Sequence, residues 1–267
     1  MMKILSLNLF LLVLIFISCN KEESKVESPI PPITIQDTNA YLKFNITTNF
    51  AGSRFVCNQR YNNVSNYTVS IDNLKFYLSN IYAIKVNGDS VLLSQIELFD
   101  YLENDTSFTV KISKADYQGI TFGIGVPTNL NSPANPDFLI SVFDHNSPLS
   151  GLNGTFWGWQ SGYRFFIFDG RFDLLPNSLE PNLTGFSIHT GNDEVFKTIE
   201  FAAIPFDISE SGTKNLTLNF DVSKFFYSDS NTIDLQTEND YHGDLSTVSL
   251  AIDLTNNIAN SIQYQAE

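Results

Sequence analysis

Hydrophobic and polar residues alternate with a period of two along much of the chain. Tyr41–Ile46 is the first such segment, and this period is typical of a half-buried β-strand. Asn87-Gly88 separates two similar segments and predicts a hairpin, because both residues tolerate positive φ. The other strand-like segments are Leu74–Leu78, Tyr82–Val86, Val91–Phe99, Phe108–Ile112, Ile120–Ile124, Tyr163–Phe168, Gly185–His189, Lys197–Ala203 and Asn215–Val222. Many short strands with turn residues between them predict an all-β fold, an antiparallel β-sandwich.

Two regions depart from this period. Thr247–Ile262 has apolar residues at helical spacing and predicts a short C-terminal helix. Pro127–Gly154 is rich in Asn, Pro and Ser, so we expect a long, partly irregular central loop region. Phe138–Phe143 within this loop region is apolar and predicts a short helix packed against the sandwich.

The residues before the first strand have the pattern of a targeting segment. Lys3 precedes the apolar run Ile4–Ile17, which is short for a bilayer span but typical of a signal peptide. The run ends at Cys19 after a small residue and resembles a bacterial lipobox, which implies cleavage and lipidation at Cys19. We therefore expect a signal peptide over residues 1–18, a lipidated cysteine and flexible tether over 19–39, and one β-sandwich domain over 40–267. The alternative is an ordinary secretory signal with a chance cysteine.

The charge balance limits the partners. The chain has 29 acidic and 15 basic residues, a formal net charge of -14. The negative net charge argues against nucleic acid as a ligand and against direct binding to an anionic membrane surface, because both favour Lys and Arg. Contact with the membrane is therefore expected through the lipid anchor. Lys21-Glu22-Glu23 resembles an export signal of surface lipoproteins in Bacteroidetes-type bacteria. We expect attachment to the outer membrane, on its periplasmic or its external face. Cys57 then has no intrachain partner and is expected to be buried.

Few residues suggest chemistry. No Walker A, Gly-x-Ser-x-Gly, His-Glu-x-x-His or Cys-x-x-Cys pattern occurs in the sequence, and we do not expect an enzyme. The three histidines are His145, His189 and His242. Imidazole is a common ligand for copper and zinc, although a single histidine is more often a structural residue. Trp157 and Trp159 would share one face of a strand, where paired aromatic residues are usually part of the core.

Several segments together resemble the MbnP-like copper-binding domain family. The shared features are a Phe-x-Cys…Tyr segment, a Gly-Val-Pro…Leu-Asn segment, a Trp-x-Trp-Gln-x-Gly-Tyr segment and a late His-x-Gly segment. They correspond to Phe55–Tyr61, Tyr117–Asn131, Phe156–Phe165 and Phe186–Gly191, and Asp72–Ile81 matches a further strand of the family. The matches follow the family's order and span most of the expected domain.

The resemblance implies a β-sandwich that binds copper through histidine. In some members a tryptophan is oxidised to kynurenine by a dihaem cytochrome c peroxidase-like partner. His189 falls on the family's late histidine, and Trp157 and Trp159 fall on its tryptophan pair. Many members read Leu-Asn-His in the central segment, but here Ser132 takes the place of that histidine. His145, further along the same loop, is therefore the predicted second ligand.

Three functions follow for comparison. The first is a lipid-anchored protein of the bacterial cell envelope that binds copper through His189 and His145 near Trp157 or Trp159, without turnover of a substrate. The second is a metal-free interaction or adhesion module that has lost the family's copper site. The third is an envelope hydrolase that uses surface carboxylates. The distance between His145 and His189 in the folded protein distinguishes the first function from the second.

Overall fold

The alternating segments form strands throughout. The computed structural model describes residues 40–103, 106–132, 143–158, 162–208, 211–229 and 231–266. The expected signal peptide, Cys19 and tether lie outside the described residues, as do Trp159 and all but the last residue of Phe138–Phe143. Thr38–Glu267 forms one compact unit.

The first sheet is built on β1 (Ala40–Phe50). It pairs in parallel with β13 (Gly212–Asp221) and antiparallel with β6 (Ser107–Ile112). The last strand, β17 (Ile262–Ala266), pairs with β13, and the short β2 (Ser53–Arg54) folds back on the end of β1. The β1–β13 pair is a parallel element within the predicted sandwich. Parallel neighbours need a long crossover, and here most strands of the second sheet lie between β1 and β13 in the chain.

The second sheet is built on β4 (Thr68–Lys85), which joins the predicted segments Leu74–Leu78 and Tyr82–Val86 into one strand. The register of its pairing with β7 shifts between Ser79 and Tyr82. Such a β-bulge bends a strand without ending it. Its antiparallel neighbours are β3 (Arg60–Asn62), β5 (Ser90–Asp100), β7 (Ala115–Ile124) and β9 (Gly162–Asp173). The other strands of this sheet are β8 (Phe156–Gly158), β10 (Thr184–Gly191), β11 (Lys197–Phe201), β12 (Phe206–Ile208) and β16 (Asp240–Tyr241), and β10 lies between β9 and β16. A separate small pair is β14 (Tyr227–Ser228) with β15 (Asn231–Thr232).

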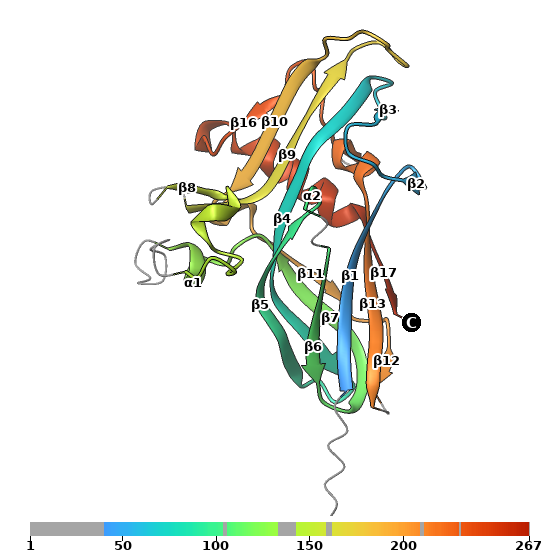
Figure 1. Ribbon diagram of the computed structural model, residues 1–267, viewed down its shortest axis with the longest axis vertical. Coiled ribbons are helices and arrows are strands. Elements are labelled where there is room, and N and C mark those ends of the chain that lie inside the picture. Colours follow the sequence, from blue (N-terminus) through green and yellow to red (C-terminus); the bar gives the residue numbers. More distant parts are fainter. Residues whose placement is uncertain are drawn as a thin grey trace, which may run out of the picture. The chain divides into compact units, whose positions relative to one another are not determined.

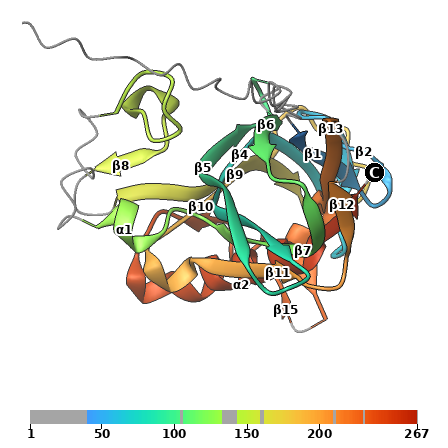
Figure 2. The ribbon, with the colours of Figure 1, turned by 90° about the horizontal axis from the view of Figure 1, so that it is seen from below.

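The two sheets face each other across an aromatic core. Phe76 of β4 stacks on Phe166 of β9 at a centroid distance of 5.1 Å and meets Phe220 of β13 at 5.0 Å. Such ring pairs stabilise a core beyond the apolar area that they bury. Viewed from below, β1, β4, β5, β6, β7, β12 and β13 surround this shared interior (Figure 2). The predicted all-β sandwich is confirmed.

The predicted C-terminal helix is also confirmed as α2 (Val248–Ser261). Leu250, Leu254 and Ile258 on one face of α2 are buried, as its amphipathic pattern requires. The helix packs against β10 and against the 3-10 helix η5 (Val222–Phe226) (Figure 1). The other helices are α1 (Thr128–Asn131), η3 (Gly151–Asn153), η4 (Asp193–Val195) and η6 (Leu245–Thr247). No helix among the described residues is both long and apolar enough to cross a membrane.

Cys57 lies at the edge of the core. Cys57 was expected to be buried; its side chain packs against the core but is only partly buried. Burial, followed by the charges of Asp72 and Asp100, raises the pKa of the thiol to about 11. The thiol is therefore protonated at neutral pH, which makes it a weak nucleophile.

Candidate functional site: a histidine pair beside Trp157

Strands β9 and β10 divide their side chains between two environments. In β10, Phe186 and Ile188 are buried, and Phe186 meets Phe226 of η5 at a ring-centroid distance of 6.1 Å. Side chains alternate along a strand, so Ser187 and His189 lie on the opposite face. Asp169 of β9 stands directly across from Ser187 in the antiparallel register. This face of the sheet therefore gathers a carboxylate, a hydroxyl and an imidazole.

A second histidine reaches the same place from β16. This strand runs parallel beside β10, with Tyr241 opposite Ile188 (Figure 1). His242 follows directly and lies beside His189, with ring centroids 4.6 Å apart and ring planes at 85°. His189 is 9% exposed, whereas the side chain of His242 is 43% exposed. One imidazole of the pair is thus enclosed and the other opens to solvent.

One carboxylate oxygen organises both rings. Asp169 Oδ1 accepts the Nε2–H of His189 at 2.7 Å and the hydroxyl of Ser187 at 2.7 Å. Ser187 Oγ in turn accepts the Nε2–H of His242 at 3.0 Å. The second carboxylate oxygen of Asp169 accepts the Asn73 side-chain amide at 3.1 Å. The Nδ1 atom of His189 is buried and has no hydrogen-bond partner within the described structure.

Asp169 is ionised in this network. Burial by itself would raise the pKa of its carboxyl group, but the hydrogen bonds from His189, Ser187 and Asn73 and the charge of His189 outweigh burial and lower it. A carboxylate that accepts several hydrogen bonds is stabilised in its charged form. Asp169 is therefore a fixed acceptor for the two donors at Oδ1.

The Ser-His-Asp composition does not make a nucleophilic triad. In a triad, serine and aspartate bind opposite nitrogens of the imidazole, so that the histidine can take the serine proton. Here Ser187 and Asp169 approach the same atom, His189 Nε2, at 3.2 and 2.7 Å. Ser187 donates its proton directly to the carboxylate. The arrangement suits a binding site rather than acyl transfer.

Trp157 covers the histidine pair from β8. Its ring centroid lies 6.4 Å from that of His189. A Cβ atom on Gly191 would lie 2.7 Å from Trp157 Cζ3, and one on Gly243 would lie 3.0 Å from the same atom. The six-membered ring of the indole is thus held against two glycines, each of which follows a histidine of the pair closely in sequence. Larger residues at either position would push the indole away.

Arg164 fastens the Trp157 segment to the sheet. Its guanidinium carbon lies 5.5 Å from the centre of the Trp157 ring, within cation–π range. Its Nη1 donates to the Gly154 carbonyl at 2.7 Å, and its backbone N–H donates to Thr155. Two buried tyrosines hold the same segment: Tyr77 donates to the Pro148 carbonyl and Tyr163 to the Leu149 carbonyl.

The structure brings together only part of the predicted site. His189 and Trp157 are neighbours, and Trp159 lies outside the described residues. His145 is exposed in a turn before η3, and within the described part of the chain no contact joins it to His189, His242 or Trp157. The partner that His189 does have is His242. No group of three or more His, Cys, Asp and Glu side chains among the described residues is arranged to hold a metal ion.

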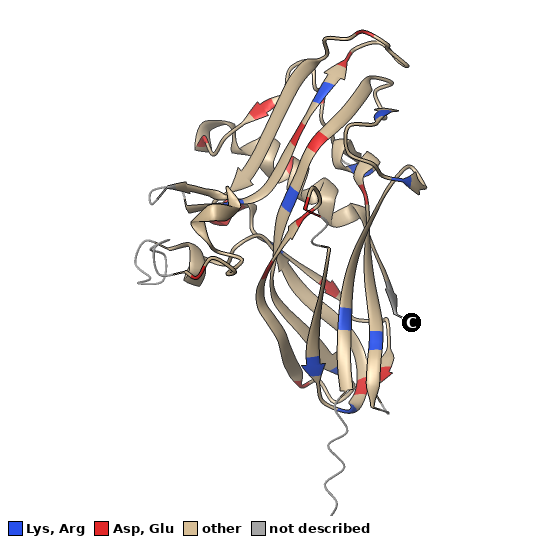
Figure 3. Ribbon diagram, in the orientation of Figure 1, with Lys and Arg blue, Asp and Glu red and all other residues tan. Residues whose placement is uncertain are grey.

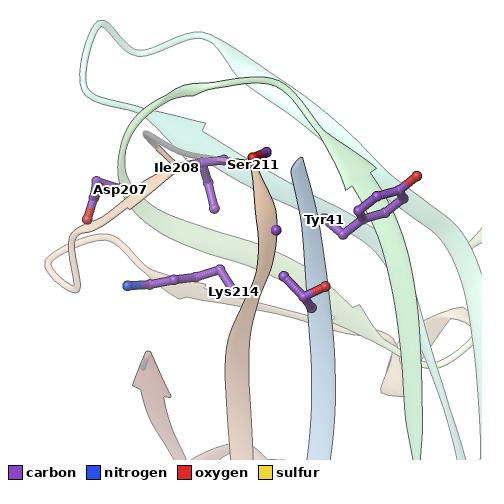
Figure 4. A pocket seen from close by; sticks show the side chains of 7 residues that line it. Tyr41, Asp207, Ile208, Ser211 and Lys214 are labelled. Atoms are coloured by element: carbon purple, nitrogen blue, oxygen red, sulfur yellow. The ribbon is translucent and has the colours of Figure 1, made fainter. Parts of the chain in front are cut away.

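Other surface features are separate from this site. A cavity of about 290 Å³ is lined by residues near the beginnings of β1 and β13, among them Tyr41, Asp207 and Lys214 (Figure 4). It contains neither histidine nor tryptophan. Acidic and basic residues both occur along β4 and β9 (Figure 3). On β16, Asp240 Oδ1 lies 3.3 Å from His242 Nδ1.

Sequence reasoning named His242 only as one of three histidines, without assigning it to the site, and did not single out Asp169. A faint signal for His242 exists, because both histidines precede a glycine, as His189-Thr190-Gly191 and His242-Gly243. No local sequence pattern points to Asp169, because an acidic residue on the outward face of any aromatic strand would look the same. Only strand pairing identifies either residue.

A protein-family model described as MbnP matches residues 39–246, a range that contains Trp157, Asp169, His189 and His242. The chain belongs to the MbnP family. Among solved structures, the MbnP from Methylosinus trichosporium is similar, with 12% sequence identity, a TM-score of 0.48, and coverage of 73% of this chain and 80% of that chain. No curated protein sequence matches this chain. The motif resemblance is thus confirmed at the level of the MbnP family.

Proposed function

We propose that this MbnP-family protein binds copper, as Cu(I), between His189 and His242 beside Trp157, and that it does so as a binder and not as an enzyme. The observation that carries the proposal is the contact of two imidazoles, 4.6 Å apart, one of which has a buried and unpartnered nitrogen. A buried polar atom without a partner destabilises the fold. A bound cation would satisfy it.

The donor set favours a soft cation with low coordination number. Imidazole suits copper and zinc, whereas Ca²⁺ and Mg²⁺ take six or more oxygen ligands. Structural zinc takes four protein ligands, and the described residues offer no cluster of even three. A metal–imidazole bond is about 2.0–2.1 Å long, and in this proposal each ring of the pair supplies one nitrogen to the same ion. His242 takes the role that the sequence suggested for His145.

The decisive measurement is a Cu(I) titration against a competing chelator. The purified protein should take up one ion per chain. Trp157 lies next to the pair, so its fluorescence should fall in step with binding; Trp159→Phe leaves Trp157 as the one remaining indole, since the chain has two tryptophans. A purified protein that takes up no Cu(I) would refute the proposal.

We also propose that Trp157 is the tryptophan open to oxidation to kynurenine by a dihaem cytochrome c peroxidase-like partner, with a peroxide as oxidant. Two peroxides supply the two oxygen atoms: the C2–C3 bond of the five-membered ring is cleaved, each carbon takes up one oxygen and two waters are released. Hydrolysis of the resulting formyl group then frees C2 as formate. The six-membered ring is the part held against Gly191 and Gly243, so the product stays anchored. The peptide that contains Trp157 should show a mass gain in protein from native cells and none in protein made without the partner. A Trp157→Phe protein that gains the same mass would assign the oxidation elsewhere.

The lipid anchor is the proposed link to the envelope, with Cys19 as the lipidated residue. Cys19→Ser removes the attachment point, so the variant should move from the membrane fraction to the soluble envelope fraction while the parent stays bound. Fractionation followed by immunoblotting measures this. A Cys19→Ser protein that remains in the membrane fraction contradicts lipid anchoring at this residue.

The second candidate function is a metal-free interaction module. The observation in its favour is a group of exposed leucines between β9 and β10: Leu174, Leu175 and Leu179 are 42%, 63% and 89% exposed. Exposed apolar groups of this kind often mark contact surfaces. A parent protein that binds no copper would leave this function as the better one.

A further inference from the structure

The partners around the histidine pair determine which atoms donate and which accept in its hydrogen bonds. His189 Nε2 lies 2.7 Å from Asp169 Oδ1, which already accepts the Ser187 hydroxyl, while Asp169 Oδ2 accepts the Asn73 amide, so neither carboxylate oxygen has a proton to donate. The nitrogen therefore has to supply the proton of its own hydrogen bond. We propose that Asp169 is the positioning residue of the site: it holds His189 in the Nε2–H tautomer, so that the buried Nδ1 atom is the nitrogen that binds copper. This inference rests on the proposed copper-binding function.

The surroundings of His189 hold its ring in place. The residue is 9% exposed, with Trp157 on one side and His242 edge-on to it. A half-turn of the ring about its Cβ–Cγ bond would exchange Nε2 with Cε1 and Nδ1 with Cδ2, so the hydrogen bond to Asp169 would be lost. The buried Nδ1 atom has no partner in the described structure to oppose this arrangement.

The arrangement is that of a metal ligand prepared before the ion arrives. Metal-binding histidines generally donate their second ring N–H to a carboxylate or carbonyl, which fixes the tautomer and raises the basicity of the binding nitrogen. Asp169 supplies this carboxylate, and Asn73 holds its other oxygen at 3.1 Å. Ser187 connects the same carboxylate to His242, whose Nδ1 lies 3.3 Å from a second carboxylate, that of Asp240.

The test reads the tautomer without metal. Long-range ¹⁵N–¹H NMR spectra of the histidine-labelled, metal-free protein should show His189 with a protonated Nε2 and an unprotonated Nδ1. Addition of Cu(I) should then shift Nδ1 and leave the Nε2–H signal in place. In Asp169→Asn, whose amide N–H is able to donate to Nε2, the Nε2–H tautomer should be lost, and Cu(I) affinity should fall about 10- to 100-fold.

Asp173→Asn is the matched control, because Asp173 lies on β9 as Asp169 does, but its carboxylate accepts from the Ser178 hydroxyl and the Leu175 N–H and has no contact with His189 in the described structure. This variant should keep both the tautomer and most of the affinity. A parent His189 protonated on Nδ1, a Cu(I)-induced shift at Nε2, or an Asp169→Asn protein with the parent's tautomer and affinity would each overturn the proposal. A parent that shows the Nε2–H tautomer but binds no copper refutes the copper function and the assignment of Nδ1 as ligand, while the positioning by Asp169 stands on the metal-free spectra.

Discussion

His189→Ala is expected to abolish Cu(I) binding, with a loss of affinity of at least about 100-fold, since even partners outside the coordination shell of a metal cost 10- to 100-fold. His189 is the enclosed member of the pair and carries the buried Nδ1 atom. His242→Ala should weaken binding strongly, because a single imidazole holds Cu(I) poorly. A competition titration of each purified variant measures both effects.

His145→Ala is the matched control for the histidine pair. His145 is exposed in a turn and makes no contact with the pair in the described structure, so its loss should leave the affinity at the parent's value. Strong weakening by His145→Ala, together with parent-like binding by His242→Ala, would restore His145 as the second ligand and reject the pair described here. Circular dichroism of all three variants verifies that each one is folded.

Phe168→Ala is expected to lower the free energy of unfolding by about 3–5 kcal/mol, the usual range for a large buried aromatic residue. Phe168 is 1% exposed and contacts Phe186, Phe225 and Phe226 at centroid distances of 5.2, 5.5 and 5.3 Å. Alanine would leave a cavity between the strand that carries Asp169 and the helical layer of η5 and α2. Urea unfolding followed by circular dichroism gives the change from the shift of the midpoint.

Leu179→Ala is the control for core packing. Leu179 is 89% exposed, and substitutions at such positions change stability by about 0.5 kcal/mol or less. Equal destabilisation by Phe168→Ala and Leu179→Ala would mean that the aromatic layer between β9 and η5 contributes little. A destabilisation confined to Phe168→Ala supports the packing described above.

Most strands and the C-terminal helix could be predicted from the sequence, because each depends on the period of its own residues. Tyr41–Ile46 alternates and lies in β1, and Thr247–Ile262 has helical spacing and contains α2. The hairpin at Asn87-Gly88 joins β4 to β5, with Gly88 at φ +91°. The parallel pairing of β1 with β13 was not predictable, since no local pattern states which distant strand is a neighbour.

The sequence by itself determined the family and the all-β class, and it singled out His189 and Trp157, which the fold places next to each other, because local motifs and their order carry this information. The choice of partner for His189 was decided by the tertiary structure alone. His145 is nearer to Trp157 in the sequence, but β16 runs beside β10 and delivers His242. Asp169 reaches the same point through the antiparallel register of β9. The site depends on contacts between strands, and hydrogen-bonded strand pairing sets those contacts over separations that periodicity and spacing do not encode.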